Sequence, residues 1–141
     1  MTSPAPDPRI AASFARQSMM RSLKARLMEG SGGRCVIRAP ILAEFGQQHG
    51  FAHGGVSFAL GDSAAGYAAL SITPPERDVL TVEMKINYLA PVRGGEIEAV
   101  GEVLRAGRRL IVVRAEVFAL SGESRRSAAV IMGTMCPVDP A

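Results

Sequence analysis

The segment from residue 54 to residue 72, GGVSFALGDSAAGYAALSI, constrains the fold more than any other part of the chain. Its composition and length predict a helix, and small residues occur on every side of it: Gly54, Gly55, Ala59, Gly61, Ala64, Ala65, Gly66, Ala68 and Ala69. A glycine inside a helix costs about 0.5–1 kcal/mol relative to alanine. We therefore interpret Gly61 and Gly66 as places where another backbone comes close, and we expect a sheet that curls tightly around this helix. Periodicity alone leaves other helix-on-sheet folds open.

The sequence after this helix alternates between apolar and polar residues, which predicts strands. The alternation is clearest at 79–90, where one face would carry Leu80, Val82, Met84, Ile86 and Tyr88 and the other Thr81, Glu83, Lys85 and Asn87. Further strands are predicted at 95–105, 109–119 and 126–136, joined by the turn sequences RAGRR and SGESR. These four segments predict an antiparallel sheet.

The first third of the chain predicts one more helix and one more strand. Apolar residues at helical spacing in 10–29 indicate an amphipathic helix that stops at the GSGG run, and 34–41 alternates as a strand. The order of helix, strand, central helix and four strands places the chain in the α+β class. We expect a single domain over residues 1–141, with 1–9 flexible.

Charge and composition exclude several classes of function. The net charge is +3, aromatic residues make up 5% of the chain and there is no tryptophan, so basic residues interleaved with stacking aromatics, typical of nucleic-acid binding, are missing. No segment predicts a membrane span or a secretory leader, which leads us to expect a cytoplasmic protein. Cys35 and Cys136 lie far apart and form no metal-ligand pattern, so we expect structural thiols and no metal or redox cofactor.

Asp62 is the one formally charged residue between Phe51 and Pro75. A carboxylate among alanines and glycines is costly to bury without compensating hydrogen bonds, and such carboxylates are enriched at active sites. The alternative reading is a solvated or backbone-bonded helix residue. Either role is open on this observation alone.

His53, Gly54 and Gly55 lie where a loop enters the central helix, whose first N–H groups the glycines leave open. Such donors, with the positive end of the helix dipole, suit the oxyanion formed in acyl transfer. A Gly-rich helix start is common, so these three residues are weak grounds by themselves. Together with Gln47 and Asp62, they predict an amide, an oxyanion hole and a carboxylate at one place.

The run from Gln47 through His53-Gly54-Gly55 to Asp62 and SAAGYAA resembles the signature of PaaI-type hotdog acyl-CoA thioesterases, the phenylacetate-pathway family. The likeness extends over roughly 34–136. It implies a hotdog fold, a homodimer or a dimer of dimers (a homotetramer), and sites that draw on two chains.

The resemblance also implies roles for individual residues. Asp62 would be the catalytic carboxylate, acting as general base or as nucleophile. Gly54, with Gly55 as a second candidate, would donate to the oxyanion, His53 would brace the loop, and Gln47 would place the water or the thioester. Thr81 matches a hydroxyl residue that the partner subunit contributes near the carboxylate, although taken alone it reads equally well as a solvent-facing strand residue. Gly66 stands where some aromatic-specific relatives have a hydroxyl, so their substrate details do not transfer.

The substrate implied is an aryl- or medium-chain acyl-CoA. Its acyl group would lie against small and apolar residues such as Phe58, Ala65 and Tyr67. Basic side chains at two turns are candidates for contacts with the CoA phosphates: Arg93, Arg105, Arg108 and Arg109. Two alternatives stay open, a non-catalytic acyl-CoA sensor and a hotdog hydratase. The hydratase motif is absent, and a sensor gives no reason for a lone carboxylate at position 62.

Overall fold

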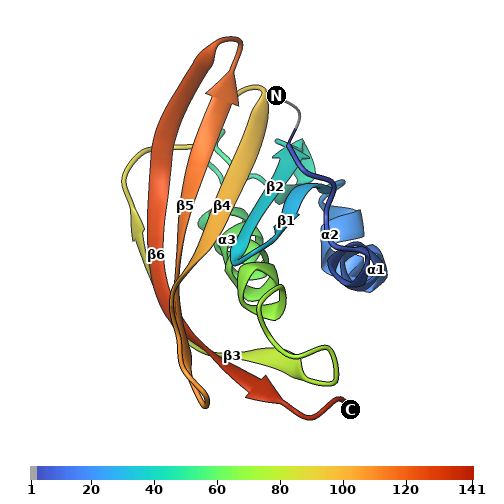
Figure 1. The fold of residues 1–141 in the computed structure, drawn as a ribbon. Helices are drawn as coiled ribbons and strands as arrows, with labels where there is room; N and C mark the ends of the chain where they lie inside the picture. The colour runs from blue at the N-terminus through green and yellow to red at the C-terminus, as the bar shows by residue number, and fades with distance from the viewer. Residues whose placement is uncertain (1–2) are drawn as a thin grey trace.

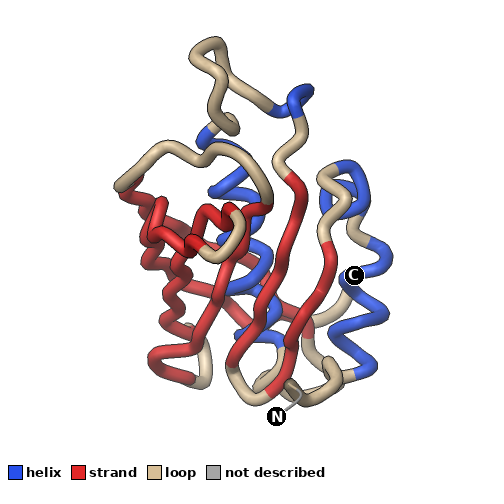
Figure 2. The backbone as a smooth tube through the Cα atoms, turned by 90° about the horizontal axis from the view of Figure 1, so that it is seen from above, coloured by secondary structure: helices blue, strands red, loops and turns tan. Residues whose placement is uncertain are grey.

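A computed structural model describes residues 3–141 and shows one antiparallel sheet with three α-helices. In chain order the elements are α1 (Pro8–Arg16), α2 (Ser18–Ser22), β1 (Arg26–Ser31), β2 (Arg34–Pro40), η1 (Ala43–Phe45), α3 (Gly54–Leu70), β3 (Asp78–Tyr88), β4 (Glu96–Ala106), β5 (Ile111–Ser121) and β6 (Ser124–Val138). The strand order is β1-β2-β4-β5-β6-β3. Figure 1, and Figure 2 from above, show α3 lying along the strands in the hollow of the curved sheet. This is the hotdog arrangement, and it confirms the α+β class.

Glycine lets α3 and the sheet touch, although not where the sequence predicted. A Cβ at Gly101 of β4 would overlap the carbonyl of Ala64, so the backbone of α3 rests directly on this strand. A Cβ at Gly61 would overlap the Ile131 side chain, which is a close approach by a side chain and not by a backbone. At Gly66 the nearest atom to an added Cβ is Met135 Cε at 3.8 Å, an ordinary contact. The expectation of a backbone contact is therefore wrong for both helix glycines.

The N-terminal region is not the single helix predicted over 10–29. Gln17 adopts an extended conformation (φ −80°, ψ 103°) and separates α1 from α2. Lys24, with φ 53°, then turns the chain into β1, which pairs with β2 through Gly32 and Gly33, both at positive φ. The GSGG run thus ends β1 and forms a hairpin turn at Gly32 and Gly33, and it is not a helix stop. Helical spacing of apolar residues gave the wrong element here because pairing with β2 decides the conformation.

Part of the segment expected to be flexible is held by the rest of the chain. Residues 1–2 lie outside the described residues. The Asp7 side chain caps α1, and the Asp7 backbone N–H donates to the Gly30 carbonyl at 2.9 Å. The Arg9 guanidinium donates to the carbonyl oxygens of Thr73 and Arg77. Residues 7–9 are therefore anchored to β1 and to the loop between α3 and β3.

β3 carries a bulge that the alternating pattern could not show. The register with β6 shifts between Thr81 and Glu83, so Val82 is the extra residue and the side chains change faces at this point. Before the bulge Val79 and Thr81 face α3, and after it Met84 and Ile86 do. Leu80 and Val82 are 62% and 57% exposed, so the predicted single apolar face over residues 80–88 is wrong. β3 is also the last strand of the sheet, with one edge unpaired.

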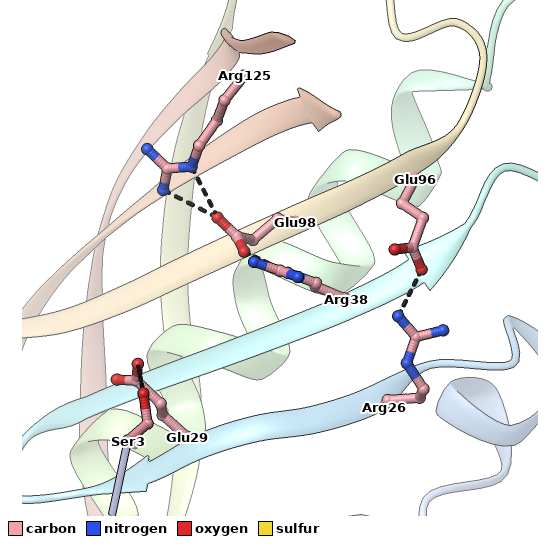
Figure 3. A network of polar contacts seen from close by, with 7 residues as sticks. All are labelled: Ser3, Arg26, Glu29, Arg38, Glu96, Glu98 and Arg125. Atoms are coloured by element: carbon pink, nitrogen blue, oxygen red, sulfur yellow. Dashed lines mark hydrogen bonds and ion pairs between the residues drawn. The ribbon is translucent and has the colours of Figure 1, made fainter. Parts of the chain in front are cut away.

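The outer face of the sheet is crossed by ion pairs (Figure 3). Glu98 is 3% exposed and accepts hydrogen bonds from Arg38 Nε at 2.5 Å and Arg125 Nε at 3.0 Å. Burial alone raises the pKa of Glu98, but the hydrogen bonds and charges of the two arginines outweigh it and hold this pKa below its ordinary value. The guanidinium of Arg125 also stacks on Phe118 at 3.5 Å. Glu98 is therefore ionised and links β4 to Arg38 of β2 on one side and, across β5, to Arg125 of β6 on the other.

Within residues 3–141, no helix is long and apolar enough to cross a membrane. Nor do these residues bring three His, Cys, Asp or Glu side chains together as a metal site.

Candidate active site

Asp62 lies in the third turn of α3, on the flank of the helix that faces the edge strand β3, and is half-buried. Its Oδ1 accepts a hydrogen bond from the Thr81 hydroxyl at 2.7 Å, and the same hydroxyl lies 3.3 Å from Met135 Sδ. The bulge at Val82 makes this possible because it leaves Thr81 pointing toward the helix. Thr81 thus contacts the carboxylate of its own chain. That the partner subunit supplies a hydroxyl near the carboxylate stays a prediction.

A cavity of about 190 Å³ opens beside Asp62; we call it the Asp62 cavity. Besides Asp62 and Thr81, its walls include Ser13, Gln17, Ser63, Tyr67 and Asp78. Three of these groups form a chain of hydrogen bonds: Ser63 donates to Gln17 Oε1 at 3.0 Å, and Gln17 Nε2 donates to the Tyr67 hydroxyl at 3.3 Å. Burial raises the pKa of Tyr67 above its ordinary value, so its hydroxyl stays protonated at neutral pH. The cavity is polar and uncharged on this wall.

The start of α3 presents one free backbone donor. His53 is the N-cap, and its Nδ1 accepts the Gly55 N–H at 2.8 Å. Gly55 is therefore already engaged, whereas the Gly54 N–H makes no hydrogen bond within residues 3–141. This donor also sits at the positive end of the helix dipole. Of the two candidate oxyanion donors, the geometry favours Gly54.

Tyr88 covers Gly54, a contact that the sequence did not indicate. Its hydroxyl donates to the Gly54 carbonyl at 2.9 Å, and a Cβ at position 54 would lie 2.9 Å from the Tyr88 ring. Glycine is needed at this position for the close approach. The exposed ring of Tyr88, at the end of β3, thereby fixes the helix start against the strand.

Gln47 begins the turn that leads into this helix start. Its carbonyl accepts from Gly50, and its side-chain oxygen accepts from the His49 N–H. With His53, Gly54, Gly55 and Tyr88 it lines a second cavity of about 580 Å³, which we call the loop cavity. The side-chain NH₂ of Gln47 forms no hydrogen bond within the described residues.

Within one chain the predicted site residues therefore form two separate groups, and not the single group that was expected. Gln47, His53, Gly54 and Gly55 line the loop cavity, whereas Asp62 and Thr81 line the Asp62 cavity. The eight residues from position 54 to position 62 correspond to roughly 12 Å along a helix. A single small group cannot touch both the Gly54 N–H and the Asp62 carboxylate of the same chain.

The four arginines are also divided. Arg93 precedes β4 and stacks on Phe51 at 4.0 Å, at the same end of the sheet as the loop cavity. Arg105, Arg108 and Arg109 surround the β4–β5 turn, at the opposite end of an 11-residue strand. The sequence expectation of two basic turns is right, but the turns lie at opposite ends of one chain.

The expected acyl-pocket residues fare differently. Tyr67 lines the Asp62 cavity, and Ala65 is fully buried against the sheet. Phe58 is half-buried and lines neither the Asp62 cavity nor the loop cavity.

Comparison with known proteins agrees with the fold and with the motif. The model of the family described as Thioesterase superfamily matches residues 49–125. A thioesterase family protein from Silicibacter pomeroyi has 37% identity, a TM-score of 0.91, and coverage of 94% of this chain and 97% of that one. A 1,4-dihydroxy-2-naphthoyl-CoA hydrolase of Listeria monocytogenes is 30% identical over 76 residues, which are 54% of this chain and 62% of that protein. The E. coli PaaI protein shares the fold, with a TM-score of 0.84 at 20% identity, covering 94% of this chain and 93% of that one. The matched segment carries the helix start and Asp62 in the same hotdog frame, and the chain belongs to the thioesterase superfamily.

Proposed function

We propose that this protein hydrolyses an acyl-CoA thioester to a free acid and CoA. The observation that carries the proposal is the pairing of a half-buried carboxylate, held by the Thr81 hydroxyl, with an open N–H at a capped helix start. Acyl transfer needs both a group that handles the attacking water and a donor for the oxyanion. Membership of the thioesterase superfamily supports this chemistry.

The two halves of the site come from two chains in this proposal. β3 has an unpaired edge, and the apolar side chains of Leu80 and Val82 in it and of Leu89 directly after it are more than half exposed. Such an edge is a template for pairing with another strand. A second copy that pairs antiparallel across a two-fold axis would set the start of one β3 against the end of the other.

The contacts of β3 make this pairing informative. Near its start Thr81 holds Asp62, and at its end Tyr88 holds Gly54. A two-fold axis close to Met84 and Lys85 would bring each Asp62 toward the partner's Gly54. The dimer would thereby contain two complete sites, each with a carboxylate from one chain and an oxyanion donor from the other.

The residues have defined roles in the reaction. The carbonyl oxygen accepts the Gly54 N–H, and its developing negative charge is stabilised by that donor and by the helix dipole. As general base, Asp62 takes a proton from water while the water oxygen adds to the carbonyl carbon; the C–S bond then breaks and the proton passes to the CoA sulfur. As nucleophile, Asp62 would itself add to the carbonyl carbon and expel CoA, leaving an anhydride for water to cleave. Incorporation of ¹⁸O from labelled water into Asp62 distinguishes the two.

The arginines at both ends suit the phosphates of CoA because guanidinium groups bind phosphate through paired donors. In the paired dimer, the end of one chain with Arg105, Arg108 and Arg109 and the end of the other with Arg93 would lie on the same side of the combined sheet. The division of these arginines in one chain is then compatible with a common nucleotide site.

Three variants test the proposal with a panel of aryl- and alkyl-CoAs and colorimetric detection of the free thiol. Asp62→Asn should retain the fold and lower kcat by about 100-fold to 10,000-fold, the scale for loss of an acid–base group. Gly54→Pro removes the N–H at a helix position that accepts proline, after a residue whose ψ of 140° allows it, and should lower kcat by about 100-fold to 1,000-fold.

Gly54→Ala is the matched control because its Cβ also crowds Tyr88 but the N–H remains. It should be clearly more active than Gly54→Pro. If the wild-type protein binds acyl-CoA but releases no thiol from any member of the panel, the proposal of a hydrolase is overturned and a non-catalytic sensor is favoured. Equal activity of the two Gly54 variants would remove this N–H from the mechanism.

A further inference from the structure

A third cavity lies along the seam between the N-terminal helices and α3, and it shares the lining residues His53 and Gly55 with the loop cavity. It has a volume of about 350 Å³, and we call it the apolar cavity because Met19, Leu23, Phe45, Val56 and Ala59 form much of its wall. The Asp62 cavity, in contrast, is lined on this side by hydroxyl and amide groups. The two cavities share no lining residue.

The boundary between them lies at Gln17. On the N-terminal segment, Gln17 lines the Asp62 cavity and Met19, two residues later, lines the apolar cavity. On α3, Ser63 lines the Asp62 cavity and Ala59, one turn earlier, lines the apolar cavity. The hydrogen bond from Ser63 to Gln17 crosses from one segment to the other at this point.

Both the oxygen and the nitrogen of the Gln17 side-chain amide form hydrogen bonds that hold it against α3. Its oxygen accepts from Ser63 and its nitrogen donates to Tyr67, and the side chain makes no capping bond to α2, which it precedes. A free glutamine side chain samples many rotamers, but two hydrogen bonds to α3 fix this one across the seam. The amide is thus fixed as part of the wall of the Asp62 cavity, next in the chain to the segment that carries Met19 of the apolar cavity.

We propose that Gln17 determines acyl-chain specificity by closing the Asp62 cavity to long chains. This inference rests on the proposed function, in which the thioester carbonyl lies beside Asp62. An acyl group that extends from that carbonyl enters a short, polar cavity and meets Gln17. Without this side chain the same path continues into the apolar cavity, past Met19 and Ala59, where further methylene groups leave water.

The test compares wild type with Gln17→Ala, using S-butyl-CoA and S-octyl-CoA, which are thioethers and cannot be hydrolysed. Each methylene buried contributes about fourfold in affinity, so the four added carbons, partly buried, should raise the octyl-to-butyl affinity ratio by about tenfold or more in the variant. The kcat/KM ratio for octanoyl-CoA over butanoyl-CoA should rise in parallel. Isothermal titration calorimetry and the thiol assay measure the two ratios.

Two control variants distinguish a steric role of the Gln17 side chain from a structural role of its hydrogen bonds between the helices. Gln17→Leu loses both hydrogen bonds but keeps the bulk, and Ser13→Ala removes the other hydrogen bond to Tyr67 and leaves Gln17 in place. Both should keep the octyl-to-butyl ratio within about twofold of wild type, even where melting temperature falls. Gln17→Ser repeats the test should Gln17→Ala not fold.

The outcomes separate this inference from the proposed function. An unchanged ratio in folded Gln17→Ala overturns the inference whether or not turnover is seen. A raised affinity ratio without thiol release in any variant supports the wall and overturns the hydrolase. If neither thioether binds wild type or variant, both proposals fall.

Discussion

The hydrogen bond from Thr81 to Asp62 predicts a defined loss of activity when the hydroxyl is removed. Thr81→Val keeps the β-branched shape that suits a strand and deletes only the donor. A hydrogen bond to a charged acceptor contributes about 1.5–3 kcal/mol. Thr81 is exposed and Asp62 half-buried, so the lower value applies, about 1.5 kcal/mol or a little over tenfold in kcat. The reasoning requires that the hydroxyl orients the carboxylate during the reaction.

The assay is steady-state thiol release with the best acyl-CoA of the panel. Thr81→Val should lower kcat about tenfold with little change in KM, because the hydroxyl contacts the carboxylate. Thr81→Ser keeps the donor and should stay close to wild type. Wild-type kcat in Thr81→Val, or equal losses in both variants, would refute the reasoning.

Three further predictions concern stability and reactivity. Gly101→Ala places a Cβ into the carbonyl of Ala64 and should destabilise the fold by at least about 1–3 kcal/mol in urea; an unchanged midpoint would show that α3 does not rest on β4. Because the pKa of Glu98 is lowered in the folded state, its contribution is present above the ordinary carboxyl pKa of about 4.3 and lost as pH falls through the folded value, so the stability advantage of wild type over Glu98→Gln should shrink between about pH 5 and pH 3. A constant difference over that range would contradict it. Burial, with the nearby charge of Glu29, raises the pKa of the Cys35 thiol to about 12, so native protein at pH 8 should leave this thiol unmodified by a disulfide reagent that labels it after unfolding.

The fold could be predicted where local pattern and tertiary pairing agree. Strands β4, β5 and β6 lie within two residues of the predicted segments at each end because their inner residues alternate without interruption. The pattern failed at 26–31, where helical spacing of apolar residues competed with pairing to β2, and at Val82, where one extra residue reverses the faces. Gly101 looked like an ordinary strand glycine, although it is the point where helix and sheet touch. None of these features leaves a local trace in the sequence.

The candidate site was predictable to a similar degree. Asp62 stands out because no other charged residue lies near it in the sequence, and His53-Gly54-Gly55 because glycines follow a capping residue. The engagement of the Gly55 N–H by His53 needs coordinates, since it depends on one side-chain rotamer. Gln17 gave no signal, because an amide within the predicted helix over 10–29 looks like a surface residue until Ser63 and Tyr67 are placed beside it.

The central claim is that one site unites Asp62 of one chain with Gly54 of another, and complementation between two inactive variants tests it most directly. Asp62→Asn and Gly54→Pro chains with different tags would be unfolded together, refolded and assayed for thiol release. Random reassociation makes half of the dimers mixed, and each mixed dimer holds one site with both wild-type groups, so about a quarter of wild-type activity should return. If the mixture is no more active than the two variants refolded separately, the site does not join these residues across two chains.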